Sequence, residues 1–227
     1  MAAYDLEEQE QIAEIKAWWK QYGNLVLGVL TAASLAVLAW QGWNWYQRSQ
    51  SSQASMVYAV LQKAVQENDM QRVKAASGEL IEKFPGTAFA PLAALAAAKV
   101  FNDAGDAKTA KLQLTWVAEH GRDEIRDLAR LRLAALLIDE KAYDEALQQL
   151  AAPGSAAFSV RFAESRGDVL AAQGKKAEAR TAYQTALDKL VDEDKSTTDK
   201  NTLQAAQANA AYRELLQLKL DTLGESQ

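Results

Sequence analysis

The stretch that decides the fold is RFAESRGDVLAAQGKKAEARTAYQTALDKL, which occupies residues 161–190. It places small and large residues at helical spacing, namely at Gly167, Leu170, Gly174, Ala179, Tyr183 and Ala186. Gly174 follows a helical run and can adopt the left-handed conformation that ends many helices. The last three of these residues recur four and three apart, so they share one face of a second helix. The stretch therefore predicts two helices joined by a tight turn.

The same arrangement occurs again in the preceding sequence. Residues 128–154 place Ala146 in the position of Ala179, 33 residues earlier. Residues 92–121 place Ala110 in the same position, 36 residues before Ala146. This spacing resembles that of tetratricopeptide repeats, whose helix pairs recur about every 34 residues and stack into a solenoid. A generic alanine-rich helical bundle is the alternative.

A long uncharged segment lies near the N-terminus. Residues 21–47 carry no charge, and the part from Leu25 to Trp43 is mostly apolar. A helix needs about 20 such residues to cross the hydrocarbon core of a bilayer. Aromatic residues flank this part on both sides, as at membrane interfaces; they are Trp18, Trp19, Tyr22, Trp40, Trp43, Trp45 and Tyr46. We therefore predict one transmembrane helix.

Two other interpretations of this segment stay open. A cleaved signal peptide is disfavoured because the preceding residues are acidic, whereas signal peptides begin with a basic region. A buried helix of a soluble protein is disfavoured because few such helices run this long without a charge. Within the predicted membrane helix, Gly28, Ala32 and Ala36 form a stripe of small residues against which another membrane helix could pack closely.

We predict an all-α protein with an N-terminal single transmembrane helix followed by a tetratricopeptide-like helical-hairpin solenoid. The predicted division is a short acidic tail with an amphipathic helix (1–23), the transmembrane helix (24–46), a stem rich in Ser and Gln (47–55), the repeats (56–190), and a charged loop with a C-terminal capping helix (191–227).

Composition argues against several classes of function. The chain has no cysteine and one histidine, His120, so thiolate chemistry is excluded and no histidine cluster for a metal exists. The net charge of −5 argues against nucleic acid as a partner, because phosphate neutralisation requires surplus Lys and Arg. No glycine-rich phosphate loop is present. We therefore expect no enzyme activity, no catalytic residue, no metal and no cofactor.

The repeats predict a surface for a polypeptide partner. In arrays of this kind, the first helix of each pair lines a concave groove. This places eight residues of mixed polarity along it, which suits an extended or helical peptide; they are Leu95, Lys99, Asn102, Leu131, Asp139, Arg161, Glu164 and Asp168.

The N-terminal sequence YDLEEQEQIAEIKAWWKQYGNLVLGVL, residues 4–30, carries a more specific resemblance. It is similar to the start of the bacterial YfgM-type family, the ancillary subunit of the SecYEG translocon, through Glu8, Gln9, Glu10, Ile15, Lys16, Trp18, Trp19 and Gly23. The order and length of the following parts agree with this family. The segment from about Val191 onward is expected to extend beyond the family core.

The resemblance implies a function without catalytic residues. It implies a cell inner membrane protein with a cytoplasmic N-terminus and a periplasmic repeat domain. The implied partners are SecYEG translocon subunits, a periplasmic chaperone, unfolded polypeptide clients and membrane lipid. Lys16 and Lys20 before the apolar segment favour the same orientation, since positive charges concentrate on the cytoplasmic side. The alternatives are a structural scaffold for another envelope complex and a cytosol-facing repeat receptor.

Overall fold

The computed structural model describes residues 2–196 and 203–224, and every regular element within them is helical. The elements are α1 (Ala2–Gln66), α2 (Met70–Lys83), α3 (Phe89–Asp103), α4 (Ala107–His120), α5 (Asp123–Asp139), α6 (Tyr143–Gln149), the 3-10 helix η1 (Ala156–Phe158), α7 (Ser159–Ala172), α8 (Lys176–Ser196) and α9 (Leu203–Gly224). The all-α prediction is confirmed. The chain divides into two compact units, residues 1–53 and 54–227.

The first unit contains the N-terminal part of α1. Its large apolar side chains between Leu25 and Leu38 are mostly more than half exposed, and so are Trp40, Trp43 and Trp45. Among the described residues, one helix is long and apolar enough to cross a membrane, in the part of α1 from Lys16 to Gln66. The predicted stem at 47–55 is helical and belongs to α1.

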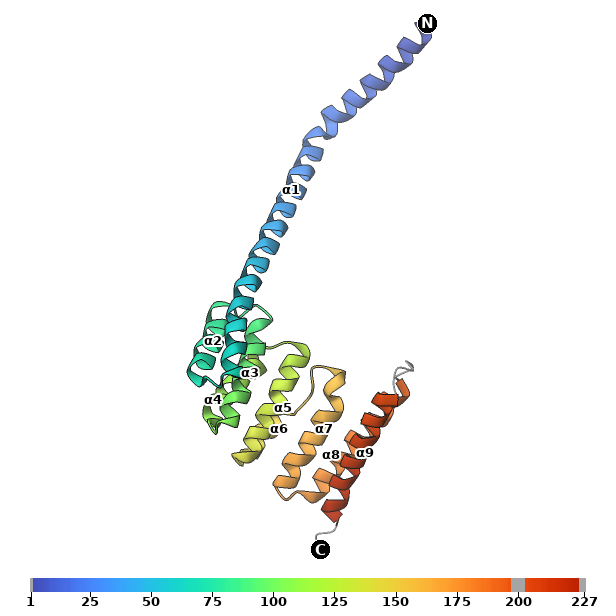
Figure 1. Ribbon diagram of the computed structural model, residues 1–227. Helices are drawn as coiled ribbons and strands as arrows, with labels where there is room; N and C mark the ends of the chain where they lie inside the picture. Colours follow the sequence, from blue (N-terminus) through green and yellow to red (C-terminus); the bar gives the residue numbers. More distant parts are fainter. Residues whose placement is uncertain (1, 197–202, 225–227) are drawn as a thin grey trace. The chain divides into compact units, whose positions relative to one another are not determined.

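The second unit is a series of antiparallel helices. Figure 1 shows α2 to α9 following one another in chain order, and each of α2 to α5 packs against the next helix in the sequence, as do α7 and α8. Two hydrophobic clusters lie between the helices. The first is formed mainly by residues 54–150, and the second by residues of α7, α8 and α9. Because α7 contributes Phe162 to the first and Leu170 to the second, it joins them.

Each hairpin turns on one residue in the left-handed conformation. These residues are Asn68, Gly105, Lys141 and Gly174, with φ of 54°, 83°, 58° and 78°. In every turn the next residue donates a backbone hydrogen bond to the carbonyl five positions earlier: Asp69 to Ala64, Asp106 to Phe101, Ala142 to Leu137 and Lys175 to Leu170, at 2.8–2.9 Å. This is the Schellman pattern of helix ends. The left-handed Gly174 expected from the sequence is confirmed.

Small residues allow the two helices of a hairpin to approach closely. A Cβ added to Gly167 of α7 would lie 2.4 Å from the ring of Tyr183 on α8, so only glycine fits this position. Ala179 and Ala186 of α8 are fully buried. The predicted alternation of small and large residues thus describes the contact between α7 and α8.

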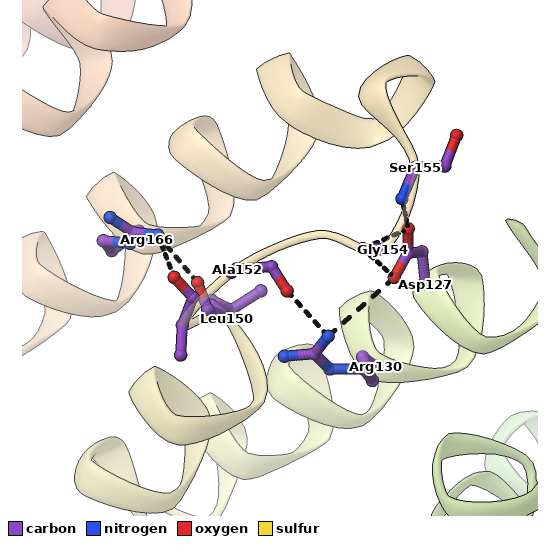
Figure 2. A network of polar contacts seen from close by, with 8 residues as sticks. Asp127, Arg130, Leu150, Ala152, Gly154, Ser155 and Arg166 are labelled. Atoms are coloured by element: carbon purple, nitrogen blue, oxygen red, sulfur yellow. Dashed lines mark hydrogen bonds and ion pairs between the residues drawn. The ribbon is translucent and has the colours of Figure 1, made fainter. Parts of the chain in front are cut away.

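The repetition changes between α6 and α7. Helix α6 has seven residues, and the chain from Leu150 to Ser155 is not helical. Figure 2 shows Asp127 of α5 pointing at this loop. Its fully buried carboxylate accepts hydrogen bonds from the backbone N–H groups of Gly154, at 2.9 Å, and Ser155, at 2.8 Å. The Asp127 carboxylate therefore accepts hydrogen bonds from backbone N–H groups that would bond to backbone carbonyl groups if the chain were helical here.

Two arginines hold the same loop by its carbonyl groups. The Arg130 guanidinium donates to the carbonyl of Ala152 at 2.7 Å and lies 3.8 Å from the Asp127 carboxylate. Arg166 of α7 donates to the carbonyl of Leu150 at 2.8 Å (Figure 2). The loop is thus fixed to α5 on one side and to α7 on the other, which sets the spacing between these two helices.

Replacing Lys141 by glycine should stabilise the second unit. A side chain in the left-handed region costs about 1–2 kcal/mol, and part of that gain is lost to the greater freedom of glycine in the unfolded chain. We expect the free energy of unfolding to rise by about 0.5–1 kcal/mol. Thermal unfolding of the detergent-solubilised chain, followed by circular dichroism, measures the change. Lys141→Ala is the control, because it removes the side chain and keeps the strain; equal stabilisation by both variants would contradict the explanation.

Replacing Asp127 by alanine should destabilise the second unit by about 2–3 kcal/mol, because it leaves the loop N–H groups without their acceptor and removes the ion-pair partner of Arg130. Limited proteolysis should cut between Leu150 and Ser155 much faster than in the original chain. Glu119→Ala, at an exposed position of α4, is the matched control. Unchanged cleavage of the Asp127→Ala loop would show that the carboxylate does not hold it.

Candidate polypeptide-binding site

Among the described residues, no group of three or more His, Cys, Asp or Glu side chains is placed to hold a metal ion. His120 stacks on Trp116 with ring centroids 5.0 Å apart, and its Nδ1 lies 3.0 Å from the Trp116 carbonyl oxygen. The single histidine is thus engaged by its own helix. The surfaces between helices are the features of this unit that can bind a partner.

One such surface is a pocket of about 330 Å³ between α3 and α5. Ala98, Leu114, Ala135 and Leu136 supply its apolar lining, and Lys99, Asn102, Arg132 and Asp139 supply its polar lining. The pocket therefore brings together three of the predicted groove residues, Lys99, Asn102 and Asp139. An apolar floor with polar groups at the edge is the usual make-up of a ligand site.

The pocket contains charged groups of both signs, and one of them is already paired. The Lys99 ammonium pairs with Asp103 one helical turn on, at 2.5 Å. Arg132 and Asp139 are exposed and lie seven residues apart on α5, on one face of that helix. The pocket can thus offer one positive and one negative group beside an apolar floor, which matches the backbone and side chains of a peptide better than a small anion.

Sequence reasoning missed Arg132 and Ala135 as part of this surface. Both share a face of α5 with Asp139, so the helical period would have identified them. In contrast, Leu95 was wrongly assigned to the groove. It is 5% exposed and belongs to the first hydrophobic cluster, because its face of α3 packs inward. Leu131 is half-buried and packs against the same cluster.

The remaining predicted groove residues lie on α7, away from the pocket. Arg161 is exposed, whereas Glu164 and Asp168 face α9 of the same chain. The Lys219 ammonium lies 2.8 Å from Glu164 Oε1 and 2.6 Å from Asp168 Oδ1. Hydroxyl groups complete this cluster, because Tyr212 donates to Glu164 and Tyr183 donates to Asp168. The structure therefore does not gather all eight predicted residues in one groove.

The charged and hydroxyl groups of this α7–α9 cluster pair with one another. Burial and the hydrogen bond to Asp168 raise the pKa of Tyr183 above its ordinary value, and burial with the hydrogen bond to Glu164 does the same for Tyr212. Burial alone would lower the pKa of Lys219, but its hydrogen bonds to the two carboxylates reverse the effect and raise it. At neutral pH the lysine is charged and both tyrosines are protonated, so the two carboxylates are occupied within the chain.

Comparison with known proteins extends over nearly the whole chain. Residues 16–225 match the family model of the tetratricopeptide repeat-like domain. A protein of Neisseria gonorrhoeae named "Ancillary SecYEG translocon subunit" is 33% identical, with 98% of this chain and 100% of that protein covered. Proteins of the same name from Haemophilus influenzae and Escherichia coli are 30% and 28% identical, covering 81% and 79% of this chain and 90% and 87% of those proteins.

A solved structure, MamA 41-end from Desulfovibrio magneticus RS-1, has a TM-score of 0.48 and 18% identity, over 77% of this chain and 96% of that chain.

The family match reaches residue 225, and the Neisseria relative is covered completely. The expectation that the segment after Val191 extends beyond the family core is therefore wrong. The chain belongs to the family of ancillary SecYEG translocon subunits, the YfgM family, and its repeat domain is tetratricopeptide-like.

Proposed function

We propose that this chain is a non-enzymatic, membrane-anchored adaptor that associates with the SecYEG protein-translocation channel. Its tetratricopeptide-like domain binds periplasmic chaperones or unfolded polypeptides that emerge from the channel. The observation that carries this proposal is the 33% identity to a protein named as an ancillary translocon subunit, over the full length of that protein. Similarity over the full length includes the apolar part of α1 as well as the repeats.

Exposure of the apolar side chains supports the anchor. Leu25, Leu35 and Leu38 are each more than 60% exposed, which is costly in water and favourable in lipid. We place residues 24–46 across the inner membrane, with the N-terminus in the cytoplasm and the repeats in the periplasm. Gly28, Ala32 and Ala36 would then face a membrane helix of a partner.

The pocket between α3 and α5 supports peptide binding. Its apolar floor can take a side chain, and Asn102, Arg132 and Asp139 can bond to a peptide backbone. A membrane tether places this pocket at a high effective concentration near emerging chains, so a weak contact suffices. Such a role requires no reaction chemistry.

If the chain associates with the channel, SecYEG subunits should purify with it from gently solubilised membranes. The experiment uses the full chain with a C-terminal affinity tag, and chemical crosslinking before solubilisation retains weak contacts. An unrelated single-pass protein with the same tag, expressed at the same level, is the control. Equal recovery of channel subunits with both proteins would contradict the association.

Topology can be tested sharply because the chain has no cysteine. Ala13→Cys lies in the N-terminal tail and Gln148→Cys in the repeats, and both positions are exposed. In spheroplasts, a membrane-impermeant maleimide should label Cys at 148 and should label Cys at 13 only after the membrane is permeabilised. The reverse pattern would favour the cytosol-facing receptor, and labelling at both positions without permeabilisation would contradict a single span.

A further inference from the structure

The first hairpin of the second unit carries an apolar groove that the chain leaves open. Met56, Val57 and Val60 of α1 and Ala75 and Ala76 of α2 line it, and it encloses about 280 Å³. Met56 is 62% exposed and Val60 is 55% exposed. Neither belongs to the buried clusters of the second unit, so both are available to a partner.

The groove lies at the free end of the repeat array. Helix α2 packs against α3, with Val73 and Leu80 fully buried in the first cluster. Every later hairpin finds a preceding hairpin to pack against, whereas residues 54–83 form the first one. Arrays of this kind need a polar cap at each end. Because the lining of this groove is apolar, the first hairpin does not provide such a polar cap.

Two charged residues, Arg72 and Glu79, also line the groove, and both are paired within the hairpin. Arg72 lies 3.2 Å from a carboxylate oxygen of Glu67 and 3.6 Å from one of Asp69. Glu79 lies 2.9 Å from the Lys83 ammonium. The groove thus offers no unpaired charge, and an occupant that matches it presents an uncharged, apolar face.

The hydrogen-bonding groups of the occupant's own backbone determine whether a helix or an extended peptide fits the groove. Groove walls made of two α-helices have no free backbone N–H or C=O groups along their length. An extended peptide lying there would leave its own backbone groups unpaired against an apolar lining, at a cost of a few kcal/mol for each. A helix pairs its backbone internally and can lay an apolar stripe into such a groove.

Chain length limits how far the groove can lie from the membrane. This step rests on the proposed membrane anchor. Met56 comes thirteen positions after Trp43, which lies in the aromatic flank of the apolar segment. This stretch spans about 20 Å as a helix and at most about 45 Å when extended. An occupant must therefore be present within this distance of the lipid.

We propose that the α1–α2 groove binds an amphipathic helix of an integral membrane protein, at the point where that helix lies on or leaves the membrane surface. The helix inserts apolar residues spaced three and four apart between Met56 and Ala75. It completes the free end of the array as a further helix would.

Site-specific photocrosslinking in native membranes tests this proposal with the full-length chain. A photoreactive amino acid replaces Met56 or Val60 in turn, and Leu112 on α4 is the matched control, because it is equally apolar and 63% exposed. We expect a discrete product from positions 56 and 60 and none from 112. Mass spectrometry of the product should map the contact to the apolar stripe of a helix in a membrane protein.

A second variant measures how much the apolar lining contributes. With the photoreactive amino acid at Ala75, the double substitution Met56→Glu and Val60→Glu should lower the yield of product about tenfold or more, because it places charges against an apolar helix. Leu112→Glu in the same background should leave the yield unchanged. Thermal unfolding checks that the double variant is folded, as expected for two exposed positions.

Several outcomes would overturn the proposal. They are no product at positions 56 and 60, a product with a second copy of this chain, with lipid or with a soluble protein, and a yield that the double substitution does not change. Failure of the proposed function is separate. Recovery of channel subunits without these products would defeat only the groove proposal, whereas a mapped membrane helix without channel subunits would defeat only the channel association.

Discussion

The second unit depends on the close approach of two helices within each hairpin. Small residues make this approach possible, as at Gly167, where any side chain would collide with Tyr183. The left-handed residue in each turn reverses the chain within a few residues and directs the small faces toward each other. Because an alanine-rich face buries little apolar area, one hairpin is not stable by itself, and stability requires the neighbouring hairpins.

Where this repetition changes, networks of polar contacts connect the helices. Helix α6 is too short to continue the pattern, and the buried carboxylate of Asp127 replaces the missing helical hydrogen bonds of the following loop. On another face of α7, Lys219 of α9 neutralises Glu164 and Asp168. Both networks connect α7 to a helix other than its hairpin partner. They determine which surfaces of the array the chain uses for itself and which remain open.

The open surfaces are consistent with an adaptor. One is the pocket with a mixed lining between α3 and α5, and the other is the apolar groove between α1 and α2. They differ in chemistry, so they suit different partners: a peptide with polar groups for the first and an apolar helix surface for the second. The proposed adaptor role would use both kinds of contact, one to stay beside the channel and one to bind other proteins.

The sequence by itself determined the helical class, the hairpins and the long apolar segment, because these follow from local spacing: the period of a helix, a glycine suited to a left-handed turn, and a run without charge. It also identified three residues of the α3–α5 pocket. Only the tertiary structure decided that Leu95 packs inward, that α9 occupies Glu164 and Asp168, and that Asp127 holds a loop 27 residues away. These contacts join residues distant in sequence, and the helical period indicates which residues share a face without indicating which helix covers that face.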